Sequence, residues 1–254
     1  MKALILAAGR GRRLQDGEDD LNKCMHTFNG KYLIQYSLES AILSEVEEIV
    51  IVVGYQAESI VNAFGISYED RRIRYVLQSD LKGPVDAMEQ AREALEGDDF
   101  FLFLGDEILC DPHPAEMVRL FHEEELFAVC GVTQVVDIDT IRKTYAVLYN
   151  PFDHRIYRLI EKPRNPTNSF MGTGNCVFRN GILDYISCTP VNQIRHEKEL
   201  PDLIQCAIDD GNSVKLFPLA SGYVNVNTAD DALIAENFFR EGCPKWKDRI
   251  TVLP

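Results

Sequence analysis

Residues 3–14 read ALILAAGRGRRL, an apolar run followed by a glycine-rich basic turn. The run at residues 3–8 has no polar position, which is typical of a strand that is covered on both faces. In the turn, Gly9 and Gly11 let the backbone approach a phosphate closely, and the arginines offer planar groups that bind phosphate oxygens. This stretch therefore predicts a buried first strand that ends at an anion-binding turn.

The turn does not match the two common phosphate-binding loops. A dinucleotide fingerprint needs a third glycine, and Leu14 stands at that position. A Walker loop needs Gly-Lys-Ser or Gly-Lys-Thr, which the sequence lacks. A surface turn with solvated arginines is the plain alternative, and three arginines within residues 10–13 make it less attractive. The same arginines stand where a secretory signal would need small residues, so we expect no signal peptide.

Strands and helices alternate through the first half of the chain. Apolar runs predict strands at residues 48–53, 73–77, 100–104 and 126–132, and helical spacing predicts helices at 33–43, 57–64, 85–95 and 114–125. Such alternation predicts a parallel sheet with helices on both faces. After about residue 137 we expect strands at 146–149, 156–160, 174–178 and 213–217 and helices at 200–210 and 228–239. Residues 1–254 are therefore expected to form one α/β domain with a strand-rich second half.

Composition excludes several classes of protein. The 254 residues include 26 basic and 40 acidic ones, a formal charge of −14, which argues against a general nucleic-acid binder. No apolar run approaches the roughly 18–20 residues that a membrane span needs. The seven cysteines are widely spaced and form no C-x-x-C, so we expect free thiols and a cytoplasmic protein without a zinc site. The sequence ends soon after the helix at 228–239, so no appended acyltransferase domain is expected.

Ligands of an open α/β sheet bind beyond the carboxyl ends of its strands. The residues that follow the predicted strands are 9–13, Gly54-Tyr55, Gln78 and Gly105-Asp106. Alone, Asp106 would be read as a turn or helix-cap residue. Its place on the same sheet edge as the basic turn favours a ligand role instead.

Several short motifs in order resemble those of sugar-phosphate nucleotidylyltransferases. The turn is similar to that family's L-A-G/A-G-x-G-T/S-R-L pattern, which is followed by a Pro-Lys pair, and Lys23 stands where that lysine belongs. The other matching motifs are Gly30-Lys31-Tyr32-Leu33-Ile34, Gln78 with Gly83, Gly105-Asp106, Glu161-Lys162-Pro163, residues 174–178 and residues 224–228. The resemblance covers essentially the whole chain. It implies a Rossmann-like three-layer mixed sheet of the nucleotide-diphospho-sugar transferase type, with a nucleotide-binding half at 1–136 and a sugar-phosphate-binding half at 137–254.

The sequence departs from the family pattern at several positions. Arg12 replaces the usual Thr or Ser, and Asn22 and Tyr32 replace prolines. Asn175 and Cys176 stand where many relatives have Ile and Tyr. These departures concern the identity of the substrate more than the type of reaction.

The resemblance implies transfer of a nucleotidyl group from an NTP to a sugar 1-phosphate, with release of pyrophosphate. Phosphoryl transfer depends on positioning and charge stabilisation. Arg13 and Lys23 are the expected charges on the α-phosphate and pyrophosphate, and Asp106 the expected catalytic ligand of Mg²⁺. Asn227 is the expected second magnesium ligand, with Asn225 a weaker candidate, and one or two protein oxygens suffice for this ion. Glu107, the neighbour of Asp106, is expected to be solvated, with a role as an extra ligand as the alternative.

The resemblance also implies the binding subsites. Gln78 would read the edge of a pyrimidine base with its amide, Gly83 would let the base approach the backbone, and Ala8, Gly9 and Gly11 would add backbone contacts. The sugar phosphate would meet Glu161 and Lys162, and Gly174 would make room for the sugar ring.

Other functions stay open at this point. A cytidylyltransferase for a non-sugar phosphate or phosphonate would share the fold, and a non-catalytic nucleotide-binding regulatory subunit would share the binding site. A nicotinamide-dependent oxidoreductase is disfavoured by the missing third glycine. The expected partners are an NTP, a phosphorylated small-molecule acceptor and, from the resemblance, a second copy of the chain, with no nucleic acid and no membrane.

Overall fold

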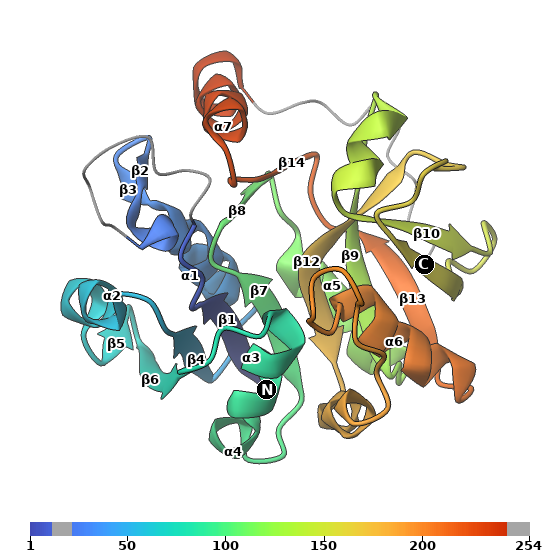
Figure 1. Cartoon of the computed structure of the whole chain (residues 1–254), viewed down its shortest axis with the longest axis horizontal. Helices are drawn as coiled ribbons and strands as arrows, with labels where there is room; N and C mark the ends of the chain where they lie inside the picture. Colours follow the sequence, from blue (N-terminus) through green and yellow to red (C-terminus); the bar gives the residue numbers. More distant parts are fainter. Residues whose placement is uncertain (12–21, 243–254) are drawn as a thin grey trace.

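A large mixed sheet runs through the middle of the molecule (Figure 1). The computed structural model describes residues 1–11 and 22–242. The strand order is β11-β10-β12-β7-β1-β4-β6-β5, with β9 also paired to β12 and β13 paired to β9. The strands are β1 (Lys2–Ala7), β4 (Glu48–Val53), β5 (Ser67–Tyr68), β6 (Arg71–Leu77), β7 (Phe100–Leu104), β9 (Ala128–Gln134), β10 (Tyr145–Tyr149), β11 (Ile156–Glu161), β12 (Phe170–Phe178) and β13 (Val214–Pro218).

Helices pack on both faces of this sheet. The α-helices are α1 (Leu33–Leu43), α2 (Ala57–Phe64), α3 (Pro84–Gln90), α4 (Arg92–Leu95), α5 (Pro114–Glu123), α6 (Leu200–Asp209) and α7 (Ala229–Glu241). Short 3-10 helices are η1 (Lys23–Met25), η2 (Ile138–Lys143) and η3 (Asn180–Ile186). The helix predicted at 85–95 is divided at Ala91 into α3 and α4.

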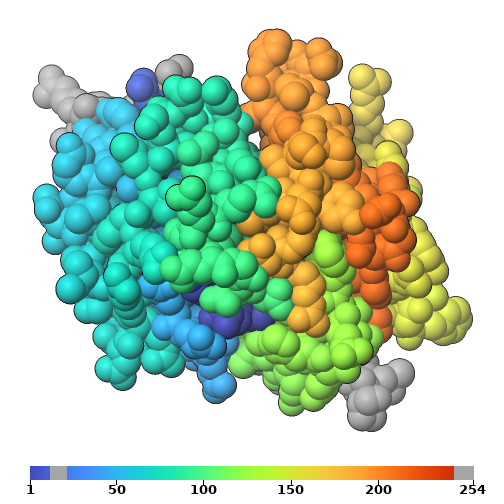
Figure 2. Space-filling model, turned by 90° about the horizontal axis from the view of Figure 1, so that it is seen from below, coloured from blue at the N-terminus to red at the C-terminus, as the bar shows by residue number. Residues whose placement is uncertain are grey.

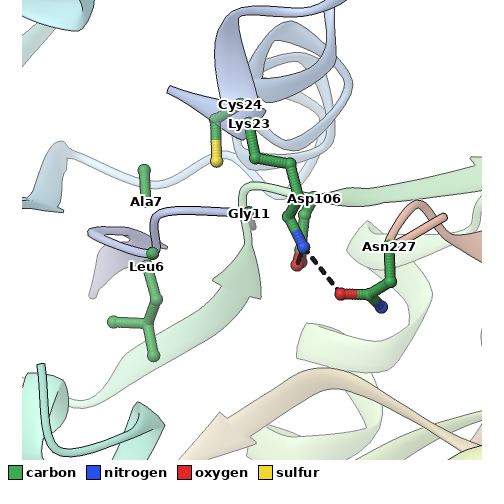
Figure 3. Close-up of a pocket in the computed structure, with 8 residues that line it drawn as sticks. Leu6, Ala7, Gly11, Lys23, Cys24, Asp106 and Asn227 are labelled. Atoms are coloured by element: carbon green, nitrogen blue, oxygen red, sulfur yellow. Dashed lines mark hydrogen bonds and ion pairs between the residues drawn. The ribbon is translucent and has the colours of Figure 1, made fainter. Parts of the chain in front are cut away.

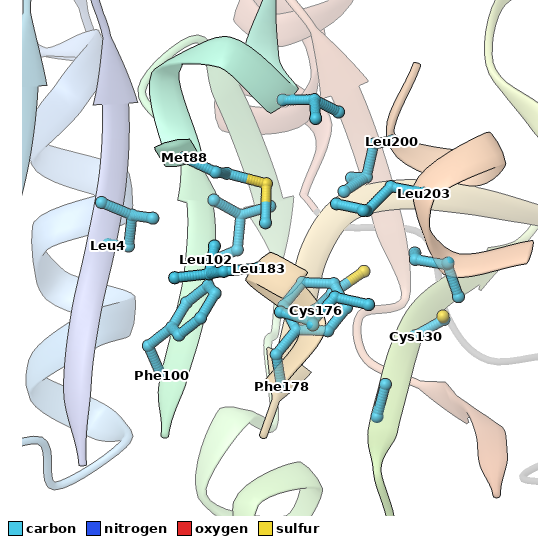
Figure 4. Packing of buried hydrophobic residues seen from close by; sticks show 14 of the residues in the cluster. Leu4, Met88, Phe100, Leu102, Cys130, Cys176, Phe178, Leu183, Leu200 and Leu203 are labelled. Carbon is cyan, nitrogen blue, oxygen red and sulfur yellow. The ribbon is translucent and has the colours of Figure 1, made fainter. Parts of the chain in front are cut away.

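Alternate residues of the central strands enter two separate hydrophobic cores. Leu4 and Phe100 belong to one core, and Ile5 and Phe101 to the other, because successive side chains of a strand point to opposite faces. Side chains from α3, α6 and η3 close the first core (Figure 4), and side chains from α1 and α5 close the second. The predicted three-layer mixed architecture is therefore confirmed.

The strand order corrects one expectation for the first half. Strands β7, β1, β4 and β6 form the predicted parallel set, but β9 does not join it. Instead, β12 lies between β7 and β9 and runs antiparallel to both. All nine residues of β12 are buried, so this strand fits the middle of the sheet better than an edge.

Two small ribbons, which the sequence did not predict, lie outside the main sheet. Strands β8 (Glu107–Cys110) and β14 (Gly222–Asn225) pair antiparallel, and β2 (Thr27–Phe28) pairs with β3 (Lys31–Tyr32). The β8–β14 ribbon matters for the site, because β8 begins next to Asp106 and β14 ends two residues before Asn227. The backbone N–H of Val226 donates to the carbonyl of Asp106 at 2.9 Å, which extends this pairing towards the sheet edge.

The two halves of the chain meet along one face of the molecule, blue to green against yellow-green to red in Figure 2. Arg92 of α4 crosses this boundary and donates to the carbonyl oxygen of Leu183 at 2.6 Å.

No helix within residues 1–11 and 22–242 is long and apolar enough to cross a membrane. The expectation of free thiols is correct for Cys24, Cys130, Cys176, Cys188 and Cys206 but wrong for Cys110, which is disulfide-bonded.

Candidate active site

A pocket of about 180 Å³ opens at the carboxyl ends of β1 and β7 (Figure 3). This is the sheet edge at which the sequence predicts ligand binding. The pocket is lined by Leu6, Ala7, Gly9, Gly11, Lys23, Cys24, Asp106 and Asn227. Its lining therefore includes residues from three distant parts of the sequence.

Lys23, Asp106 and Asn227 converge in this pocket. The Nζ atom of Lys23 forms an ion pair with the Asp106 carboxylate and donates to Oδ1 of Asn227 at 2.9 Å. The side chain of Lys23 is only 8% exposed and that of Asp106 20%. Figure 3 shows the three polar groups pointing towards one another from η1, the end of β7 and the segment after β14.

Lys23 is positioned by Asn22, one of the departures from the family pattern. Asn22 is fully buried and caps η1, because its Oδ1 accepts from the backbone N–H of Cys24 at 2.9 Å. Its Nδ2 donates to the carbonyl oxygens of Ala7 at 3.2 Å and Tyr55 at 2.7 Å. Asn22 thus ties the lysine segment to the ends of β1 and β4.

Asn227 is oriented by its own neighbours. Its Nδ2 donates to Oδ1 of Asn225 at 2.6 Å, so its Oδ1 is the atom that faces Lys23. Its backbone N–H donates to Asp231 at 3.1 Å, within the capping box formed by Thr228 and Asp231 at the start of α7. Asn225 therefore acts on the orientation of Asn227 in this arrangement and donates no oxygen to the pocket lining.

Both the backbone conformation and the packing at position 11 require a glycine. Its φ is +63°, in the left-handed region, and a Cβ at this position would lie 2.5 Å from the Cβ of Lys23. Gly9 has open space where a Cβ would be. Arg10 lies over the ring of Tyr55, with 5.1 Å from its guanidinium carbon to the ring centroid. Arg13, the second predicted charge, lies outside the described residues.

Of the predicted nucleotide-binding residues, Gly9 and Gly11 line the pocket, whereas Ala8, Gln78 and Gly83 do not. The amide nitrogen of Gln78 donates to the Gly83 carbonyl at 3.2 Å and to Asp86 at 2.7 Å, so its two N–H groups are already used. Only the amide oxygen of Gln78 is left for a ligand, whereas the predicted recognition of a base uses the amide as both donor and acceptor. Glu197 packs against Gly83, 2.3 Å from the position of a Cβ there. Ala8 is buried, and its carbonyl accepts from Tyr55.

The predicted sugar-phosphate residues are in the second half, at the end of β11 and within β12. Glu161 accepts from Arg195 at 2.7 Å and lies 3.5 Å from the ammonium of Lys162. Lys162 is half-exposed and has a left-handed φ of 43°. The space beside Gly174 is filled rather than open, because a Cβ there would lie 2.3 Å from Leu104. Packing against Leu104 therefore requires a glycine at position 174, and the expected contact with a sugar ring stays a prediction.

The solvated position predicted for Glu107 is wrong, and Arg195, a partner of the predicted residue Glu161, has no counterpart in the sequence analysis. Glu107, expected to be solvated, is 3% exposed, and burial together with the charge of Asp106 raises its pKa to about 8. Arg195 bridges Glu161 and Glu199, with its Nη2 2.6 Å from Oε1 of Glu199. Burial and the charge of Glu161 raise the pKa of Glu199 to about 7. Neither residue belongs to a motif, so no local signal marked them.

The oxygens of Asp106 and Asn227 already surround a cation, the Lys23 ammonium. A carboxylate and an amide oxygen are hard ligands, and Mg²⁺ needs only one or two of them from the protein. The described part of the chain holds no group of three or more His, Cys, Asp or Glu side chains suited to a metal. The Asp106–Asn227 pair therefore fits a magnesium ion that takes its remaining ligands from phosphate and water.

Two of the curated proteins of similar sequence match nearly the whole of this chain. The UTP–glucose-1-phosphate uridylyltransferase AglF of Haloferax volcanii is 27% identical over 242 residues, covering 95% of this chain and 97% of that protein. The bifunctional protein GlmU of Methanococcus maripaludis is 28% identical over 246 residues, 94% of this chain. The chain spans about half of GlmU, 54% of its length.

Solved structures share the fold. An apo UDP-glucose pyrophosphorylase superposes with a TM-score of 0.84 at 19% identity, covering 94% of this chain and 98% of that one. An inositol-1-phosphate CTP transferase from T. maritima superposes with a TM-score of 0.74 at 24% identity, covering 96% and 98%. The model of the nucleotidyl transferase family matches residues 2–248, nearly the full length of the sequence. The chain therefore belongs to the nucleotidyl transferase family.

Proposed function

We propose that this protein transfers a nucleotidyl group from an NTP, preferably a pyrimidine nucleotide, to a sugar 1-phosphate and releases pyrophosphate in a Mg²⁺-dependent reaction. The observation that carries the proposal is the convergence of Lys23, Asp106 and Asn227 beside the Gly9–Gly11 turn. A cation and oxygen ligands next to an exposed glycine turn suit the binding of a triphosphate. The similarity to AglF, whose name states UTP and glucose 1-phosphate, supports this choice of substrates.

Asp106 and Asn227 would hold the magnesium ion. Bound there, the ion would neutralise charge on the phosphates during transfer. Asn225 would keep the amide oxygen of Asn227 turned to the ion through the 2.6 Å hydrogen bond. The proposed ligand pair has one negative charge, so most of the ion's charge would be left to act on phosphate.

Lys23 would supply positive charge to the phosphate oxygens. Its ammonium is nearly buried, and electrostatic interactions are stronger where water is excluded. The backbone of Gly11 lies beside the lysine stem, because a Cβ on this glycine would overlap the Lys23 side chain. Arg13 would add a second charge from the same turn.

Glu161 and Lys162 would bind the acceptor. Arg195 holds the Glu161 carboxylate at 2.7 Å, so the half-exposed Lys162, which lies 3.5 Å from the same carboxylate, would turn towards a phosphate without leaving Glu161 unpaired. On the nucleotide side, the amide oxygen of Gln78 would accept from a base N–H, since its own N–H groups are engaged. Uracil and thymine present such an N–H at N3.

A second candidate is transfer to a non-sugar acceptor such as an inositol phosphate. The structural similarity to the inositol-1-phosphate CTP transferase favours it, as do Asn175 and Cys176 at positions where the family pattern differs. The site machinery would be the same in either case, and only the acceptor and base would change.

The test is pyrophosphate release measured across a matrix of UTP, dTTP, CTP, ATP and GTP against sugar 1-phosphates and inositol 1-phosphate. We expect turnover with a pyrimidine nucleotide and a hexose 1-phosphate, and its loss when Mg²⁺ is chelated. Asp106→Ala should abolish turnover, whereas Asp70→Ala, at an exposed position far from the pocket, should not. No turnover in any pairing would reject the enzymatic proposal and favour a nucleotide-binding regulatory subunit.

A further inference from the structure

A buried carboxylate lies one residue beyond the proposed magnesium ligand. Glu107 is 3% exposed, although it directly follows Asp106 in the sequence. Its Oε1 accepts from the backbone N–H of Gly174 at 3.1 Å and from the Tyr223 hydroxyl at 2.6 Å. Its Oε2 accepts from the amide of Asn175 at 2.6 Å. Three donors from two other strands therefore converge on one side chain.

These contacts join parts of the molecule that carry different subsites. Glu107 belongs to the nucleotide half and starts β8, whereas Gly174 and Asn175 lie on β12 and Tyr223 on β14 of the second half. Strand β14 leads to Asn227, and Gly174 lies on β12, the strand next to β7, after which Asp106 follows. The carboxylate is thus a fixed point shared by both halves beside the pocket.

The burial of Glu107 carries a cost in free energy. A carboxylate removed from water is costly unless hydrogen bonds or an opposite charge compensate it. The ion pairs of the described residues include none to Glu107, so its hydrogen bonds carry the compensation. A purely packing role would be filled at lower cost by an apolar side chain. The geometry is better explained by a need to hold Gly174 and β14 at fixed positions.

We propose that Glu107 is a positioning residue that holds the Gly174 backbone and strand β14 in register with Asp106. It would act through the Gly174 backbone on the acceptor subsite, without touching substrate itself. The proposal rests on the proposed function, because the effect on the acceptor is read in that reaction.

Two substitutions at Glu107 separate positioning from simple stability. Glu107→Leu removes both acceptor oxygens and takes from the Gly174 N–H and the Tyr223 hydroxyl the acceptor that they share. Glu107→Gln keeps one carbonyl oxygen for those two donors and offers an N–H to Asn175, whose amide can turn to present its oxygen. The matched control is Gln205→Leu, which removes another buried polar side chain, one that accepts from the N–H of Leu159 in α6–β11 packing.

The experiment measures kcat and both KM values of the full-length variants, together with thermal unfolding. We expect Glu107→Leu to raise KM for the sugar phosphate and lower kcat, each by about tenfold or more, with KM for the NTP changed by less than about twofold. Glu107→Gln should recover most of the wild-type kcat and of the wild-type KM for the sugar phosphate. If Glu107→Leu does not fold, Tyr223→Phe, which deletes one donor and keeps the shape, should show the same selective rise at about threefold. Equal rises in both KM values, or the same selective rise in Gln205→Leu, would overturn the proposal.

Hydrogen exchange of the 170–178 segment supplies a readout that needs no substrate. The Gly174 amide should exchange at least about tenfold faster in Glu107→Leu, or about threefold faster in Tyr223→Phe, than in a Gln205→Leu protein of equal melting temperature. Unchanged exchange would contradict positioning by Glu107 even if the kinetics differ. Absence of turnover in the wild type would reject the proposed function, and the exchange result would still decide the role of Glu107.

Discussion

Replacing Gly11 by alanine tests how the glycine turn places Lys23. The new Cβ would stand on a backbone with φ of +63° and 2.5 Å from the Cβ of Lys23. The contacted atom is next to the lysine backbone, so a rotation of the side-chain end does not relieve the overlap. Either the turn or the η1 segment must shift.

The loss of folding free energy in Gly11→Ala has two parts. A left-handed backbone costs an ordinary residue about 1–2 kcal/mol, and overpacking costs about 1–3 kcal/mol. The sum, about 2–5 kcal/mol, corresponds to a fall in melting temperature of roughly 4–20 °C for a chain of this size. A displacement of about 1 Å at Lys23 would also lower kcat by about 100-fold.

Two other glycines separate these contributions. Gly30 has a φ of +77° but open space around a Cβ, so Gly30→Ala should lose only the backbone part, about 1–2 kcal/mol. Gly9 has neither constraint, so Gly9→Ala should change stability by less than about 0.5 kcal/mol. Thermal unfolding of the three variants measures the order of their stability losses, which should be largest for Gly11→Ala and smallest for Gly9→Ala. If Gly11→Ala melts no lower than Gly30→Ala, or keeps wild-type kcat, the overlap with Lys23 has been misjudged.

Three further substitutions probe the charged and polar parts of the site. Lys23→Met should lower kcat by about 100- to 1,000-fold yet tighten Mn²⁺ binding without nucleotide in calorimetry, because the ammonium no longer competes for the Asp106 and Asn227 oxygens. Asn22→Pro restores the residue of the family pattern and fits the φ of −60°, but it removes three buried hydrogen bonds, so urea unfolding should report a loss of about 1–3 kcal/mol rather than a gain. Glu199 has its pKa raised to about 7, so between about pH 4.5 and 7 the folded state keeps a proton that the unfolded state has lost. The stability of the wild type relative to Glu199→Gln should therefore fall as the pH rises through that window, by no more than about 3 kcal/mol in pH-dependent unfolding.

The sequence predicted well whatever depends on local pattern and on the rule for strand ends. The runs at 48–53 and 100–104 coincide with β4 and β7 as predicted, because uninterrupted apolar residues leave few alternatives to a buried strand. Asp106 followed from its place after β7, and the pocket does open there. The place of Lys23 beside Asp106 came only from the family resemblance, since the segment between β1 and η1 has no periodicity.

What the sequence could not predict depends on partners far away along the chain. Strands β8 and β14 are four residues each and pair across more than 100 positions, so neither has a recognisable pattern of its own. Glu107 looked solvated because local reading sees only an acid beside another acid. Its donors lie 67, 68 and 116 residues away, and only the folded chain brings them to it.

The charge balance of the site follows from the same long-range contacts. A formal charge of −14 opposes the approach of a triphosphate, yet each carboxylate placed in the proposed site has partners. Lys23 pairs with Asp106, donors surround Glu107, and Arg195 lies between Glu161 and Glu199. Because Lys23 occupies the oxygens proposed for magnesium, the metal would compete with the lysine for them, and a bound metal would free the ammonium for phosphate. Binding of the metal and binding of the nucleotide would then reinforce each other, each removing a charge that opposes the other.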